Sequence, residues 1–104
     1  MQEDFEDYRN DAITSNEENA IKLYAYPNPV IEGLNIEFDN ENISKDCKVS
    51  IINSLGILIK KFNESEMSIS SNKIYVLLDD LSSGSYILQV ENHGVKYYVR
   101  FIRK

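Results

Sequence analysis

The sequence predicts an all-β protein built as an antiparallel sandwich, and three observations support this prediction. From residue 21 onward, apolar and polar side chains alternate with a period of two in a series of short runs, as in strands with one buried face. Turn-forming residues separate the runs at intervals of roughly 8–15 residues. The chain also has seven tyrosines and four phenylalanines but only two prolines, a composition that favours strands.

Seven strands are expected, and each has one apolar face and one largely polar face. In chain order they cover residues 21–25, 34–38, 47–51, 56–62, 74–78, 86–90 and 95–101. Turn signals separate them at residues 27–29, 39–42, 53–56, 70–72, 82–84 and 92–94. In the last turn, Gly94 is expected to adopt the positive φ that other residues resist.

The long connections, residues 39–46 and 63–72, are polar and lack helical periodicity. They therefore do not supply the crossover helices that parallel strands need. The expected fold is an immunoglobulin-like antiparallel β-sandwich of about seven strands.

Residues 1–20 differ in composition from the rest of the chain. They hold seven acidic residues and one basic residue, so this segment carries the whole net charge of −6. We expect a flexible acidic linker here, and the alternative is a short helix with Phe5, Tyr8 and Ala12 on one face. Residues 21–104 then form the sandwich. That body is electrically neutral, so it lacks the basic stripe of a nucleic-acid-binding domain.

Targeting signals are not evident. No run of about 18 apolar residues is present, so no transmembrane segment is expected. The acidic N-terminus differs from a secretory signal, which begins with positive charge and an apolar stretch. The chain is expected to be either the excised tail of a longer protein or a small stand-alone relative of one.

The residues offer little for catalysis. Cys47 is the only cysteine and His93 the only histidine. We expect a buried core cysteine and an exposed turn histidine rather than a nucleophilic pair. One cysteine and one histidine do not complete a zinc site, and no glycine-rich phosphate loop exists. An enzyme is therefore not expected, nor a cofactor or a metal.

Other polar clusters have simpler interpretations. The acidic stretch 39–42 with Glu37 lacks the ordered spacing of a calcium loop. Asp79 and Asp80 are adjacent, so on a strand they would point to opposite faces and not share a proton. The serines around Gly84 precede a strand, whereas a nucleophile elbow precedes a helix.

Three features occur in order along the chain. Tyr26-Pro-Asn-Pro29 closes the first strand, Gly56 lies within Ile52–Phe62, and Leu81–Val90 contains Leu-x-x-Gly-x-Tyr. A short basic strand then ends the chain. This series resembles the C-terminal sorting domain of type IX-secreted proteins in Bacteroidetes, and the resemblance covers residues 21–104. One departure is Arg100, where members of that family often have lysine; the charge is kept but the hydrogen-bond geometry changes.

The resemblance implies a role in protein export. The domain would be recognised by the type IX outer-membrane translocon, and a sortase-like peptidase would cut the leader near residues 10–20. The protein would pass through the periplasm to the outer-membrane surface or the extracellular space. The alternative function is an immunoglobulin-like binding or adhesion module of a small secreted protein.

Two groups of candidate site residues follow. The residues of the resemblance are expected to be mainly structural, because prolines and glycines fix turn geometry; they are Pro27, Asn28, Pro29, Gly56, Leu81, Gly84 and Tyr86. Tyr86 has inward parity, so its hydroxyl group is expected to bond to backbone. The candidate recognition residues are Lys96, Arg100, Phe101, Arg103 and Lys104. We also expect their strand to expose an edge for strand addition by a partner.

Overall fold

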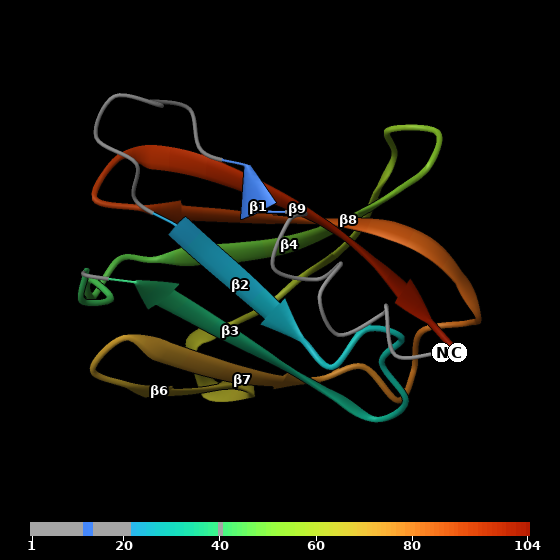
Figure 1. Ribbon diagram of the computed structural model, residues 1–104, viewed down its shortest axis with the longest axis horizontal. Helices are drawn as coiled ribbons and strands as arrows, with labels where there is room; N and C mark the ends of the chain where they lie inside the picture. Colours follow the sequence, from blue (N-terminus) through green and yellow to red (C-terminus); the bar gives the residue numbers. More distant parts are fainter. Residues whose placement is uncertain (1–11, 14–21, 40) are drawn as a thin grey trace.

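The computed structural model describes residues 12–13, 22–39 and 41–104 and shows two sheets packed face to face (Figure 1). The first sheet has the order β1 (Ala12–Ile13), β9 (Val95–Arg103), β8 (Gly84–Asn92), β4 (Lys48–Asn53), β5 (Leu58–Lys61). The second has the order β2 (Lys22–Tyr26), β3 (Gly33–Asp39), β7 (Lys73–Leu77), β6 (Met67–Ser70). All neighbouring strands are antiparallel. This strand order is that of an immunoglobulin-like sandwich, so the predicted fold class is confirmed.

Two strands were not predicted. β6 lies in the polar stretch 63–72, after the single 3-10 turn η1 (Glu64–Glu66), and its side chains are mostly exposed. It forms because its backbone hydrogen-bonds to the edge of β7. Since no residue of β6 is fully buried, burial imposes no pattern by which its sequence would reveal the strand. β1 lies within the predicted leader and pairs with β9. The rest of the predicted linker, and the alternative helix there, lie outside the described residues.

The core lies between the sheets and contains the predicted apolar faces. Its largest fully buried side chains are Tyr97, Phe38, Phe101, Leu23, Leu34, Ile36, Ile51, Ile74, Leu78, Leu88, Val30 and Val49. The rings of Phe38 and Tyr97 meet edge to face across the two sheets, with centroids 5.1 Å apart. Close packing of this kind gives the domain most of its stability.

Asn92 is the one buried polar residue within the described part of the chain. Its Nδ2 donates hydrogen bonds to Glu41 Oε2 at 2.7 Å and to the Asn42 carbonyl oxygen at 3.0 Å. Its Oδ1 accepts one from the Ser44 N–H at 2.8 Å. Asn92 therefore ties the connection between β3 and β4 to the end of β8. The turn predicted at 92–94 is formed by His93 and Gly94, with φ values of 54° and 77°.

We predict that Asn92→Ala lowers the free energy of unfolding by about 2–3 kcal/mol, because it leaves the Ser44 N–H without its buried acceptor and the Glu41 carboxylate without a buried donor. Urea unfolding followed by circular dichroism measures this. Asn42→Ala is the control, since its exposed side chain has no hydrogen bond to any residue that the structure describes, and it should cost less than about 0.5 kcal/mol. Equal effects of the two substitutions would contradict the role given to Asn92.

Stability should also fall in alkali. Burial, with smaller effects from Asp46, Glu41 and Glu91, raises the pKa of the Cys47 thiol to about 11. The unfolded thiol ionises near 8.5–9. Between these values the unfolded chain has released a proton that the folded chain keeps, so stability decreases as pH rises. Burial, then Glu41, raises the pKa of Tyr97 to about 12, which acts in the same direction at higher pH.

The urea midpoint should therefore decline from pH 8 to pH 10, and Cys47→Ala should flatten that decline. Slopes are compared rather than absolute stabilities, because the alanine leaves a small cavity. Identical slopes in both proteins would show that Cys47 does not contribute.

Candidate functional site

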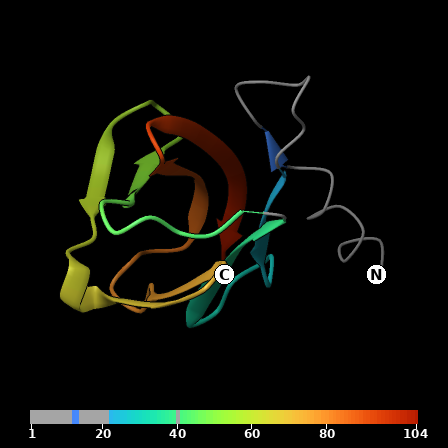
Figure 2. The ribbon, with the colours of Figure 1, turned by 90° about the vertical axis from the view of Figure 1, so that its left-hand side faces the viewer.

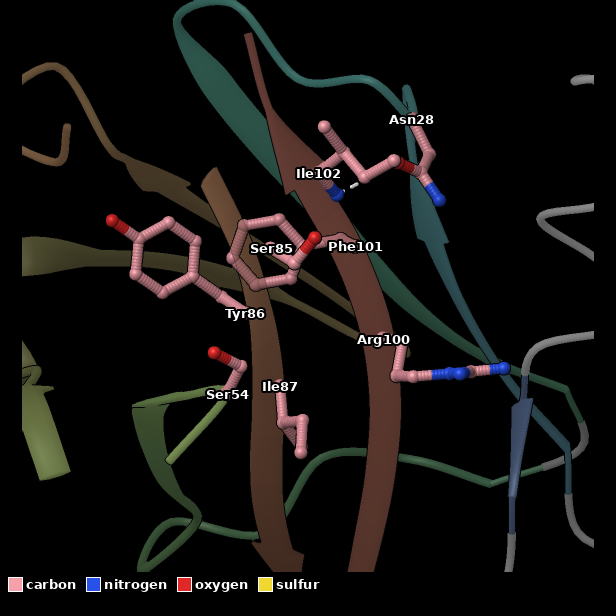
Figure 3. A pocket seen from close by; sticks show the side chains of 8 residues that line it. All are labelled: Asn28, Ser54, Ser85, Tyr86, Ile87, Arg100, Phe101 and Ile102. Atoms are coloured by element: carbon pink, nitrogen blue, oxygen red, sulfur yellow. Dashed lines mark hydrogen bonds between the residues drawn. The ribbon is translucent and has the colours of Figure 1, made fainter. Parts of the chain in front are cut away.

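A shallow groove of about 400 Å³ lies where β8 and β9 pass the turn between β4 and β5 (Figure 3). It is lined by Asn28, Ser54, Ser85, Tyr86, Ile87, Arg100, Phe101 and Ile102. Ser85, Ile87, Arg100 and Ile102 alternate with buried residues along their strands. They therefore lie on the outer face of the five-stranded sheet, and the groove opens on that face.

The groove brings together every segment of the sequence that carries the family resemblance. Asn28 comes from the Pro-Asn-Pro turn, and Ser54 comes from the turn that contains Gly56. Residues 85–87 follow the Leu-x-x-Gly segment, and residues 100–102 belong to the basic terminal strand. Register explains part of this convergence, because Ile87 pairs with Arg100 and Ser85 with Ile102.

Asn28 binds the C-terminal strand directly. Its Oδ1 accepts a hydrogen bond from the Ile102 N–H at 2.9 Å, seen as a dashed line in Figure 3. Val30 continues the contact, donating to the Ile102 carbonyl at 2.7 Å and accepting from the Lys104 N–H at 2.8 Å. The peptide bonds before Pro27 and Pro29 are both cis. The Pro-Asn-Pro turn thus presents an acceptor side chain to the edge of β9.

The Leu81–Tyr86 segment is held by burial and one hydroxyl group. Leu81 is buried, and Gly84 opens β8 opposite Arg103. The Tyr86 hydroxyl donates to the Ser82 carbonyl at 2.8 Å, while its ring stacks on Phe101 with centroids 5.8 Å apart. The predicted inward tyrosine with a backbone-bonded hydroxyl is therefore present. It corresponds to the tyrosine corner of immunoglobulin-like domains.

The turn between β4 and β5 is organised by Asn53. Its Oδ1 accepts hydrogen bonds from the Leu55 N–H at 2.9 Å and the Ile57 N–H at 3.0 Å. Gly56 has a φ of 83°, a conformation that a side chain would oppose. Gly56 is thus in the turn rather than in the strand predicted for residues 56–62, which begins at Leu58.

The candidate recognition residues do not form one exposed cluster. Lys96, Arg100 and Lys104 are exposed. Arg103 is half-buried, and its Nε donates to the Leu78 carbonyl at 2.9 Å. Phe101 is 1% exposed and lies in the core. It faces inward like Tyr97 and Val99, so in the folded domain its side chain is not on the surface, and its part in recognition stays a prediction.

The edge of β9 is also less open than expected. Ala12 and Ile13 pair with Val99 and Tyr98, and Val30 forms a parallel bridge with Arg103. Figure 2 shows β1 and β2 beside this side of the sandwich. Strand addition at residues 102–104 is therefore blocked by the chain itself.

The residues that the sequence offered for catalysis or metal binding lie apart from the groove. Cys47 is buried, whereas the His93 side chain is 55% exposed and its Nε2 lies 3.2 Å from the Asn42 carbonyl. Asp79 and Asp80 occupy a turn after β7 rather than a strand. Among the described residues, no three His, Cys, Asp or Glu side chains are placed to hold a metal ion. In the same part of the chain, no helix is long and apolar enough to cross a membrane.

Sequence reasoning missed several members of the groove, namely Ser54, Ser85, Ile87 and Ile102. The alternation in the sequence predicts outward positions for Ser85, Ile87 and Ile102, but it assigns the outer face to polar side chains, so the isoleucines there were not singled out. Ser54 lies in a turn, where no alternation exists. Nothing in the sequence indicated that Asn28 would reach a strand 74 positions later.

Strand order and tyrosine corner define an immunoglobulin-like domain, and the groove joins the segments typical of one family of them. The chain belongs to the family described as secretion system C-terminal sorting domains, whose pattern matches residues 24–104. It is thus a C-terminal sorting signal for type IX secretion, and that family is non-catalytic.

One relative is the ulvan lyase NLR42 of Nonlabens ulvanivorans, a member of the Bacteroidetes. It is 40% identical over 75 residues, which cover 70% of this chain and 12% of that protein. The chain therefore spans a small part of this relative. No solved structure matches the chain.

We predict that Asn28→Leu weakens the attachment of the terminal residues, whereas Asn28→Asp does not, because aspartate keeps an acceptor oxygen. Loss of one hydrogen bond worth about 1 kcal/mol should speed amide exchange of Ile102 about fivefold. Hydrogen exchange followed by NMR measures this, with the Leu88 amide in the central strand β8 as the internal reference. An unchanged Ile102 rate in Asn28→Leu would contradict the assignment.

Proposed function

We propose that the type IX outer-membrane translocon recognises this domain through its groove face, and that a sortase-like peptidase then removes the domain by cutting within residues 10–20. The observation that carries the proposal is the convergence of the family's separate sequence segments on one groove. Residues required only for folding have no reason to gather on an outer surface. A shared recognition surface accounts for the gathering.

The residues divide into two roles. Arg100, with Lys96 and Lys104, supplies exposed positive charge for docking, where complementary charge speeds and orients association. Asn28, Phe101 and Arg103 act as positioning residues, because their contacts fix the course of the strand that bears Arg100. No residue of the chain acts as a catalyst in this scheme.

The leader is the proposed site of cleavage. Proteases require accessible, extended backbone, and residues 1–20 are polar and acidic and, β1 (Ala12–Ile13) apart, precede the strands of the sandwich. A cut there separates the sorting domain from an upstream passenger and leaves the core intact. The passenger is then released to the outer-membrane surface or the extracellular space.

An adhesion module is the second candidate, because the strand order is that of immunoglobulin-like binding domains. Specific micromolar binding of the isolated chain to a glycan or protein array would favour it. The translocon proposal predicts no such binding partner outside the export machinery.

Export of a reporter tests the main proposal. A signal peptide, a fluorescent reporter and residues 1–104 are fused and expressed in a type IX-competent bacterium and in a strain that lacks the translocon. Reporter should reach the medium or cell surface only in the first strain, and its mass should show a cut within residues 10–20. Retention in the periplasm of the competent strain would refute the sorting role. Export without a cut there would refute only the cleavage step.

A further inference from the structure

The outer face of the five-stranded sheet carries one row of aliphatic side chains that ends in a cation. The register pairs Leu58 with Ile52, Ile52 with Ile87, and Ile87 with Arg100, so the row crosses β5, β4, β8 and β9 in turn. Leu58 is 53% exposed, Ile52 and Ile87 are half-buried, and Arg100 is exposed. With strands about 4.8 Å apart, the row is about 14 Å long.

Neighbouring residues enlarge the row at both ends. Leu55 and Ile57, at the tip of the β4–β5 turn, are 79% and 54% exposed, and Ile102 beside Arg100 is 48% exposed. The adjacent row is mostly polar, since Lys61 pairs with Ser50 and Ser50 with Gln89, and it ends on β9 at Tyr98. Contiguous exposed apolar surface with a polar border is typical of an interaction site.

Charge indicates what this row binds. The groove around Arg100 contains no carboxylate among its lining residues, and Arg100 makes no ion pair with the described residues. Lys60, by contrast, lies 3.4 Å from Glu66 and 3.5 Å from Asp80. A planar guanidinium that donates no hydrogen bond within the described part of the chain matches a carboxylate through two parallel hydrogen bonds.

A second copy of the chain is a poor occupant. Stacking two rows antiparallel would place Arg100 on the other copy's Leu58 and desolvate the guanidinium against an aliphatic side chain, which costs free energy. Stacking them parallel would bring two Arg100 side chains together. The row therefore fits a different protein.

We propose that the row Leu58, Ile52, Ile87 and Arg100 docks a segment of the export machinery that presents a stripe of aliphatic side chains with an aspartate or glutamate at its β9 end. The stripe is about 14 Å long, the length of roughly nine helical residues. This inference rests on the proposed sorting function and names the chemistry of its partner. In Figure 3, the Arg100 side chain extends from β9 to the side opposite β8. The partner's carboxylate would meet the guanidinium on that side.

The reporter fusion tests the inference with matched variants. Arg100→Glu should reduce exported reporter at least tenfold, and Ile87→Ser should reduce it severalfold. Lys48→Glu is the control, because Lys48 is exposed on the same sheet face but lies outside the row, and it should change export less than twofold. Thermal unfolding of each purified chain confirms that the variants fold.

Charge reversal then identifies the carboxylate. Each exposed Asp and Glu of the outer-membrane export components is changed to lysine in cells that carry the Arg100→Glu fusion. Restored export at one such position, with that lysine change impairing export of the unaltered fusion, supports the inference. Normal export of folded Arg100→Glu, or restoration at no position, overturns it while leaving the sorting function intact. Failure of the unaltered fusion to be exported refutes the sorting function instead.

Discussion

The register between β8 and β9 governs most of what this domain presents. Nine residue pairs join the two strands, and a two-residue turn with positive φ at His93 and Gly94 sets their alignment. Because side chains alternate between faces, a slip of one residue would exchange every inward and outward position. The same alignment therefore places Phe101 in the core and Arg100 on the surface.

The end of β9 is fixed a second time, by the Pro-Asn-Pro turn. The carboxamide of Asn28 and the backbone of Val30 hydrogen-bond Ile102 and Lys104, while Arg103 bonds the Leu78 carbonyl. Together these contacts leave the terminal residues little freedom. A sorting signal read from such a strand is a fixed shape rather than a flexible peptide, so a partner loses less entropy on binding it.

The outer face of the five-stranded sheet carries both polar side chains and a row of aliphatic ones. Polar side chains such as Ser50 and Gln89 lie on this face beside the aliphatic row and Arg100. The proposed docking on this face does not require an open strand edge, which matters because the chain itself covers part of the β9 edge. Strand addition by a partner needs an open edge, whereas recognition by side chains needs an exposed sheet face. The partly covered edge of β9 favours recognition by side chains.

The sequence by itself determined the strands whose inner face is buried, because burial imposes a period of two that residues such as Leu34, Ile36 and Phe38 display directly. It also determined the turns at Gly56 and Gly94 and the inward position of Tyr86. It did not reveal β6, whose pairing with β7 depends on backbone hydrogen bonds rather than on burial. Only the tertiary structure decided that Asn28 meets Ile102 and that Leu58, Ile52, Ile87 and Arg100 form one row. Such contacts join residues far apart in the chain, and strand pairing, which no local pattern encodes, brings them together.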